Sequence, residues 1–160
     1  HSKNLIHTDL KFENIMIDML DENIRNIIEV AREYQQQDDV VIGTIDGDDS
    51  LCNDDTVKLV LDEYEKGSDV VWTAHRWDIN SMNISREIPH NVNPYQWPWC
   101  TSHLRTFRAS LLSSIDDKNF KHVSGKWFER GYDQALMLPL LSLTKNRKYS
   151  FGKLLLSGCV

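Results

Sequence analysis

The chain has 160 residues, of which 41% are hydrophobic and 26% charged, and its formal net charge is −6. This composition predicts one globular domain over residues 1–160, large enough to enclose a single hydrophobic core. The acidic balance argues against nucleic acid as a partner, because proteins that bind phosphate backbones usually present a basic surface. No apolar run is long enough to cross a bilayer, so we expect no transmembrane segment in this chain.

The three cysteines, Cys52, Cys100 and Cys159, are far apart and lack the spacing of a metal site. We therefore expect reduced thiols in a cytoplasmic protein, with peripheral attachment at a membrane as the alternative. The chain begins with His1 rather than Met, and we expect it to be a fragment.

Hydrophobic periodicity predicts alternating helices and strands. In chain order we expect a helix over 21–36, a strand over 40–45, a helix over 55–67 and a strand over 69–75. A long loop then covers 76–99. It is followed by an extended segment at 101–107, a short helix at 108–115, a helix at 132–144 that contains Pro139, and a last strand at 148–156. This order predicts an α/β fold with a mixed, mostly parallel sheet flanked by helices.

The first two helices each show one apolar face. On the first helix it consists of Ile24, Ile27, Ile28, Ala31 and Tyr34, and on the second of Val57, Val60, Leu61 and Tyr64. Asp21 is a suitable N-cap for the first helix, and Asn53 or Asp54 for the second. Gly67 is suited to end the second helix.

Three carboxylates, Asp46, Asp48 and Asp49, follow directly after the strand predicted at 40–45. Like charges this close repel one another unless a cation lies among them. An EF-hand is excluded, because Leu51 and Val57 stand where such a loop needs Gly and Glu. Ligands of α/β sheets bind beyond the carboxyl ends of strands. We therefore expect Mg²⁺ or Mn²⁺ to bind here and to bridge a nucleotide diphosphate, with an acidic turn that binds nothing as the alternative.

Four segments, "VVIGTIDGDDSL", "DVVWTAHRW", "WCTSHLRTFRASLL" and "GKWFERGYDQALMLPLLSL", cover most of residues 38–145. In order and spacing they resemble the family 2 glycosyltransferases with the GT-A (Rossmann-like) fold. The resemblance implies metal-dependent, inverting transfer of a sugar from a nucleotide-diphosphate sugar to an acceptor hydroxyl, on a saccharide or another molecule. It also implies that the first nucleotide-binding strand of the fold is missing, since we expect no strand before the first helix. The Gln-x-x-Arg-Trp motif of processive synthases is absent, which favours transfer of a single sugar.

The resemblance also suggests roles for individual residues. Asp133 matches the position of the acidic general base, where many members have Glu-Asp and this chain has Tyr132-Asp133. The alternative is that Asp133 only caps a helix. Asp46 would contact the donor as well as the metal.

His103 and Arg105 are candidates for binding the donor pyrophosphate, because guanidinium groups suit phosphate. Trp99 is a candidate for stacking on a sugar ring. The alternative for these three residues is a structural role, anchoring a loop or packing in the core.

Two other functions stay open. "IDGDDSL" also resembles the first motif of haloacid dehalogenase-like phosphatases, in which Asp46 would be the nucleophile and Asp48 the acid. The chain could instead be a non-catalytic sugar- or nucleotide-binding remnant. Residues 5–18 resemble the catalytic loop of protein kinases, but no Asp-Phe-Gly or Ala-Pro-Glu segment follows, so we set that possibility aside.

Overall fold

A computed structural model of the chain describes residues 15–18, 24–46, 49–51, 55–77 and 79–158. The strands are β1 (Ile15–Asp18), β2 (Val41–Thr44), β3 (Asp49–Leu51), β4 (Val70–Trp77), β5 (Arg105–Arg108) and β6 (Arg147–Gly158). The α-helices are α1 (Ile24–Glu33), α2 (Thr56–Glu65) and α3 (Tyr132–Leu143). Short 3₁₀ helices cover Pro94–Gln96, Ala109–Ser114 and Asp117–Phe120. The domain is therefore mixed α/β.

The strands form one mixed sheet in the order β1-β2-β5-β4-β6-β3. The β1–β2 and β4–β6 pairs are parallel, whereas β2–β5, β5–β4 and β6–β3 are antiparallel. The expectation of a mostly parallel sheet is therefore wrong for the described strands. The reason is β5, which lies between β2 and β4 and is reached through the long segment after β4 rather than through a helical crossover.

A strand also precedes the first helix, contrary to expectation. β1 pairs in parallel with β2, with Ile15 opposite Val41 and Asp18 opposite Thr44, so that β1, α1 and β2 form a β-α-β unit. The sequence did not indicate this strand because it is only 4 residues long and lies beside segments without clear periodicity. The absence of a nucleotide-binding strand stays a prediction.

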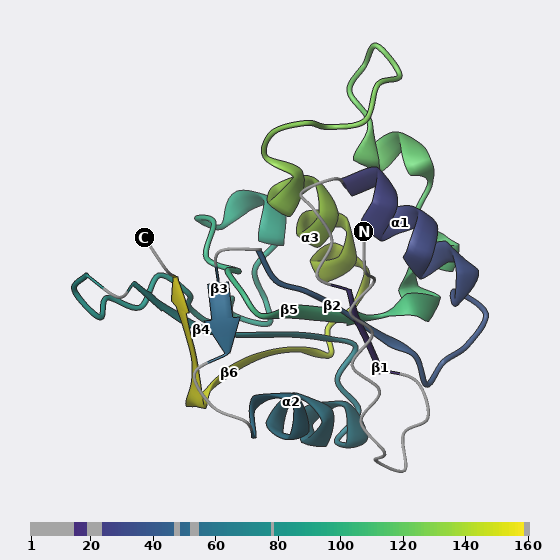
Figure 1. Ribbon diagram of the computed structural model, residues 1–160. Coiled ribbons are helices and arrows are strands. Elements are labelled where there is room, and N and C mark those ends of the chain that lie inside the picture. The colour runs from purple at the N-terminus through teal and green to yellow at the C-terminus, as the bar shows by residue number, and fades with distance from the viewer. Residues whose placement is uncertain (1–14, 19–23, 47–48, 52–54, 78, 159–160) are drawn as a thin grey trace.

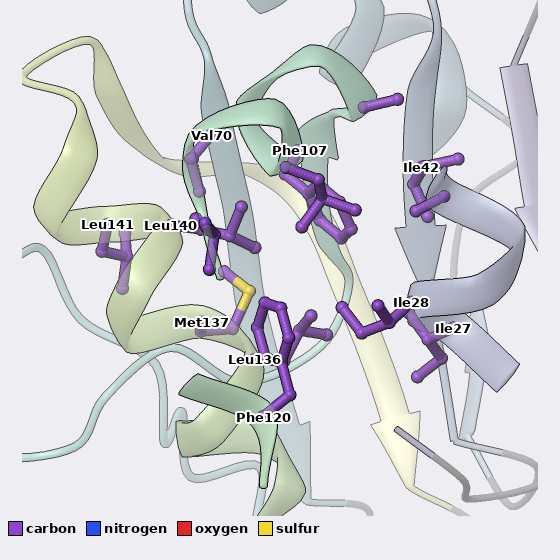
Figure 2. Packing of buried hydrophobic residues seen from close by; sticks show 14 of the residues in the cluster. Ile27, Ile28, Ile42, Val70, Phe107, Phe120, Leu136, Met137, Leu140 and Leu141 are labelled. Carbon is purple, nitrogen blue, oxygen red and sulfur yellow. The ribbon is translucent and has the colours of Figure 1, made fainter. Parts of the chain in front are cut away.

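Helices cover both faces of the sheet. Figure 1 shows α1 and α3 over one face and α2 against the other. A large hydrophobic cluster lies under α1 and α3, and a smaller one, which includes Val60, Tyr64 and Leu104, lies under α2. Figure 2 shows Met137 and Leu140 of α3 turned toward the strands that carry Val70 and Phe107. The domain thus has three layers, with the sheet between the two layers of helices.

The predicted faces of the first two helices are largely confirmed. Ile24, Ile27, Ile28 and Ala31 of α1 are buried, and Tyr34 just after the helix packs on the large cluster. On α2 the buried residues are Thr56, Val60, Leu61 and Tyr64, while Val57 is only half-buried. Gly67 follows α2 with a φ of 94°, a left-handed conformation that suits glycine.

Asp55 occupies the N-cap position of α2, without a side-chain capping bond. The predicted caps Asp21, Asn53 and Asp54 lie outside the described residues, as do Cys52 and Cys159. Cys100 is a buried free thiol.

Side chains fix the long loop after β4 to the rest of the domain. Trp72 Nε1 donates to the carbonyl oxygen of Arg86 at 2.9 Å. Arg147 Nη2 donates to the carbonyl oxygens of Pro89 and Val92 at 2.8 and 2.7 Å. The loop therefore returns to the sheet at a defined place, just before β5. None of the helices in the described ranges is long and apolar enough to span a bilayer.

We expect Leu140→Ala to lower the free energy of unfolding by about 2–5 kcal/mol, because it leaves a cavity beneath α3 where Leu140 is fully buried. Leu143→Ala is the matched control on the same helix, since Leu143 is 46% exposed. That change should stay within about 0.5 kcal/mol. Urea unfolding measures both, and equal losses would contradict the described packing of α3.

Candidate functional site

Polar side chains gather where β2 ends and β5 begins. The two strands are antiparallel neighbours with Thr44 opposite Arg105, so the segment after β2 lies beside the segment before β5. β4 pairs antiparallel with the other side of β5 and runs to the same edge. This arrangement brings Asp46, His75 and His103 together from three segments that are distant in sequence.

Asp49 reaches this edge from β3. Its Oδ2 lies 2.7 Å from Nδ1 of His103, and its Oδ1 lies 3.4 Å from Nε2 of His75. The Asp49 side chain is only 6% exposed, and both imidazoles are buried. One ligand atom from each of the three residues lies within 4.8 Å of the others, so together they could hold a metal ion.

The two imidazole nitrogens that face Asp49 make no hydrogen bond, although a carboxylate oxygen is close to each. The opposite nitrogens do have partners. His75 Nδ1 lies 2.7 Å from Ser102 Oγ, and His103 Nε2 lies 3.2 Å from Asp46 Oδ1. The described residues contain eight buried side-chain nitrogen or oxygen atoms without a hydrogen-bond partner. These two nitrogens are notable among them because a carboxylate oxygen lies close to each.

His75 is a neutral imidazole at pH 7. Burial lowers its pKa below the ordinary value of 6.5; the Asp49 carboxylate opposes this shift and the neighbouring His103 adds to it. A neutral ring carries a single N–H. In the tautomer with that hydrogen on Nδ1, the ring donates to Ser102 Oγ and turns the lone pair of Nε2 toward Asp49.

Asp46 is held as a carboxylate by its neighbours. Burial acts to raise the pKa of its carboxyl group, but hydrogen bonds from His103 and Tyr132 and the charge of Arg105 keep it below its ordinary value. Tyr132 Oη donates to Asp46 Oδ1 at 3.2 Å. Burial, together with the carboxylates of Asp46 and Asp133, raises the pKa of the Tyr132 phenol, which therefore stays protonated and able to donate.

Arg105 connects this cluster to α3. Its guanidinium is only 2% exposed; Nη1 donates to Asp133 Oδ1 at 2.7 Å, and Nη2 contacts His103 Nε2. A buried positive charge needs such partners, because its desolvation is otherwise strongly unfavourable. The Asp133 side chain is 32% exposed, so solvent and solutes still reach it.

Asp133 lies in the first turn of α3 but does not cap the helix. Gly131 occupies the N-cap position, with a φ of 64°. The alternative in which Asp133 is a plain helix cap is therefore wrong. Its carboxylate is instead directed to Arg105.

The structure brings together most of the residues singled out in the sequence. Five of them form one connected cluster: Asp46, Asp49, His103, Arg105 and Asp133. Asp48 lies outside the described residues. Trp99 is half-buried and packs on the large hydrophobic cluster, which is the structural role that was its alternative. The chemical roles of the five clustered residues stay predictions.

Sequence reasoning missed His75 and Tyr132. His75 was seen only as the residue that ends the predicted strand at 69–75, and no metal-binding spacing connects it to Asp49 or His103. Tyr132 was noted only as a replacement for an acidic residue, whereas it donates a hydrogen bond to Asp46. The sole signal for His75 was its place at a strand end, the same signal that marked Asp46.

An open pocket of about 310 Å³ lies beside the start of α3. Its lining includes Tyr95, Phe128, Arg130 and Gln134, so aromatic surface and polar groups are both present. Gly131 and Gln134, which flank the Asp133 turn, belong to this lining.

A scan of the sequence against protein-family models finds no match, and a search of curated proteins finds none that is significantly similar. The residues of the site are therefore the basis for proposing its function.

The lowered pKa of His75 predicts a pH-dependent stability. Because the folded protein resists protonation of this ring, the unfolded chain binds more protons as the pH falls, and stability is lost. We expect the melting temperature in chelator-containing buffer to fall as the pH drops from about 7.5 to about 5.5, and this loss to be smaller in His75→Gln. His90→Gln, which removes an exposed histidine, is the control. Identical pH profiles for wild type and His75→Gln would contradict the neutral, buried ring.

Proposed function

We propose that the protein is a metal-dependent glycosyltransferase of the GT-A kind, which moves a sugar from a nucleotide-diphosphate sugar to an acceptor hydroxyl. The observation that carries this proposal is the single cluster that joins Asp46, Asp49, His103 and Arg105 to Asp133. It combines groups suited to a diphosphate and its metal with a carboxylate suited to proton removal. Such a reaction requires both.

The donor side of the cluster would bind the diphosphate. Carboxylates suit Mg²⁺ and Mn²⁺, and a bound divalent ion supplies positive charge that stabilises the departing diphosphate. Asp46 and Asp49 are the described residues of the acidic segment available for that task, with Asp48 as a further candidate. Arg105 is almost fully buried, so it would act by holding His103 and Asp133 rather than by direct contact with phosphate.

The acceptor side would use Asp133 as general base. The acceptor hydroxyl attacks the anomeric carbon, a new C–O bond forms there, and the bond from that carbon to the diphosphate oxygen breaks. The electron pair leaves with the diphosphate, and the hydroxyl proton passes to Asp133. Arg105 holds Oδ1 of Asp133, while the 32% exposure of the side chain leaves it accessible to an acceptor.

The pocket beside α3 is a candidate for binding the acceptor, since its lining includes Gly131 and Gln134 on either side of Asp133, although not Asp133 itself. Tyr95 and Phe128 offer apolar ring surface, and Arg130 and Gln134 offer hydrogen-bond donors. This combination suits a saccharide, which has apolar faces and many hydroxyl groups.

The phosphatase alternative is less well supported. Oδ1 of Asp46 accepts from Tyr132 and lies 3.2 Å from His103 Nε2, but the side chain is 31% exposed, so accessibility does not separate the two functions. Such phosphatases place a lysine beside the nucleophile, whereas among the described residues the positive group in this cluster is Arg105. A non-catalytic remnant would explain donor binding, and Asp133 would then serve only as the partner of the buried Arg105.

We expect Asp133→Asn to lower turnover by roughly 10²–10⁴, the usual contribution of a positioned general base. Nucleoside diphosphate release would be measured with a panel of UDP- and GDP-sugars in the presence of Mn²⁺. Affinity for UDP or GDP with Mn²⁺ should persist, because the amide oxygen can still accept from Arg105 and the acidic segment is unchanged.

Asp117→Asn is the matched control, because Asp117 forms an Arg–Asp pair of the same 2.7 Å length with Arg32, away from this cluster. It should leave turnover unchanged. An unchanged rate in Asp133→Asn would remove Asp133 from the mechanism, and absence of turnover with every donor would contradict the proposed function.

A further inference from the structure

Three ligand-type side chains converge at the sheet edge from three different segments. Asp49 comes from β3, His75 from β4, and His103 from the residues just before β5. Two imidazoles are an unusual addition to an acidic diphosphate site, because carboxylates alone suffice for Mg²⁺. Their presence suggests a more specific metal site than the acidic segment alone indicates.

The ligand atoms lie close enough together to share an ion after small adjustments. With metal–ligand bonds of about 2.1 Å, two ligand atoms lie about 3.0 Å apart at a right angle and about 3.4 Å apart at the tetrahedral angle. The separation of Asp49 Oδ1 from His75 Nε2 is 3.4 Å, as at the tetrahedral angle, whereas Asp49 Oδ2 lies 2.7 Å from His103 Nδ1, which is closer than a shared ion would hold them. Small side-chain adjustments would therefore bring all three to an ion.

The two imidazole nitrogens that face Asp49 make no hydrogen bond to any other group of the described residues. Both imidazoles are buried, at 7% and 3% exposure for His75 and His103, and His75 Nε2 and His103 Nδ1 lack hydrogen-bond partners. A lone pair that faces a carboxylate oxygen is repelled by it unless a cation lies between them. A metal ion would satisfy both nitrogens and the carboxylate at once.

The far side of each ring is arranged as in metal-binding histidines. Such histidines donate their other N–H to a carboxylate, carbonyl or hydroxyl group, which fixes the ring. Here Ser102 Oγ lies 2.7 Å from His75 Nδ1, and Asp46 Oδ1 lies 3.2 Å from His103 Nε2. Arg105 Nη2 also contacts His103 Nε2. Ligation through Nδ1 requires the tautomer with the ring hydrogen on Nε2, which then donates to Asp46, and Arg105 then has Asp133 as its hydrogen-bond acceptor.

The formal charges also leave room for a divalent cation. Asp46, Asp49 and Asp133 contribute three negative charges, and Arg105 contributes one positive charge. The carboxylates of the described cluster therefore outnumber its guanidinium by two. One divalent ion would neutralise this excess.

We propose that Asp49, His75 and His103 bind one divalent first-row transition-metal ion, of the range from Mn²⁺ to Zn²⁺, in preference to Mg²⁺. Imidazole nitrogen favours these ions, whereas Mg²⁺ prefers oxygen ligands. This arrangement narrows the metal role given above to the acidic segment: Asp49 is the ligand, and Asp46 is a positioning residue that orients His103. Three protein ligands leave coordination positions open for an outside molecule.

We take the open coordination positions of the metal ion to face the oxygens of the donor diphosphate, and this assignment rests on the proposed function. The metal site itself does not depend on that function. Its test therefore uses metal ions alone, without any nucleotide sugar.

The test is calorimetric titration of the chelator-stripped protein with ZnCl₂, MnCl₂ or MgCl₂. We expect one saturable ion per chain, tighter binding of Zn²⁺ than of Mn²⁺, and no saturation by Mg²⁺ at concentrations at which Mn²⁺ saturates. His75→Gln and Asp49→Asn should each abolish saturable binding. Asp46→Asn should weaken binding by about 10–100-fold, as loss of a residue that orients a ligand does.

His90→Gln and His122→Gln remove exposed histidines and should bind like wild type. Circular dichroism in EDTA verifies that each variant is folded. His103→Gln should also abolish saturable binding. If that variant does not fold, pulsed electron paramagnetic resonance of the Mn²⁺-loaded wild type tests the role of His103 instead. That spectrum should show coupling to two imidazole nitrogens.

Wild-type affinity in His75→Gln, equal affinity for Mg²⁺ and Zn²⁺, or no nitrogen coupling would overturn the proposal. If the histidine variants bound metal normally while EDTA still stopped sugar transfer, the proposed metal site would be wrong, and the proposed function would still be supported. If the metal bound as expected but no nucleotide sugar were turned over, the proposed function would be wrong, and the proposed metal site would still be supported.

Discussion

The buried guanidinium of Arg105 is the constraint on which the arrangement of the site depends. At 2% exposure its charge has left water, and such a charge is tolerated only with partners in good geometry. Asp133 provides one partner at 2.7 Å, and His103 lies against the other end of the guanidinium. Because β5 positions Arg105, the start of α3 and the segment after β2 are both drawn to the same edge of the sheet.

This constraint explains why the residues divide into two groups. Arg105 is occupied by Asp133, and Asp46 accepts a hydrogen bond from Tyr132. His75 and His103 each retain a nitrogen without a hydrogen-bond partner, and both of these nitrogens lie near the carboxylate of Asp49. The first group orients and the second group is available to bind, which is the division that a site for a charged ligand requires.

Much of the fold could be predicted from the sequence, and the reasons are local. Ile24, Ile27, Ile28 and Ala31 repeat with helical spacing, and they are buried as that spacing indicates. Strand direction could not be predicted in this way, because the antiparallel insertion of β5 depends on where the long loop after β4 returns. The approach of His75 to Asp49 has the same origin. It requires the strand order around β5, which no local pattern encodes.

Diffraction from a crystal grown with Mn²⁺, recorded where manganese scatters anomalously, tests the central claim most directly. The claim is that this cluster exists to hold a cation between its two buried imidazoles. It predicts an anomalous peak within about 2.0–2.2 Å of Asp49, His75 Nε2 and His103 Nδ1, with Asp46 bound to His103 rather than to the ion. A peak on the acidic segment without either imidazole, or no peak at this edge of the sheet, would contradict it.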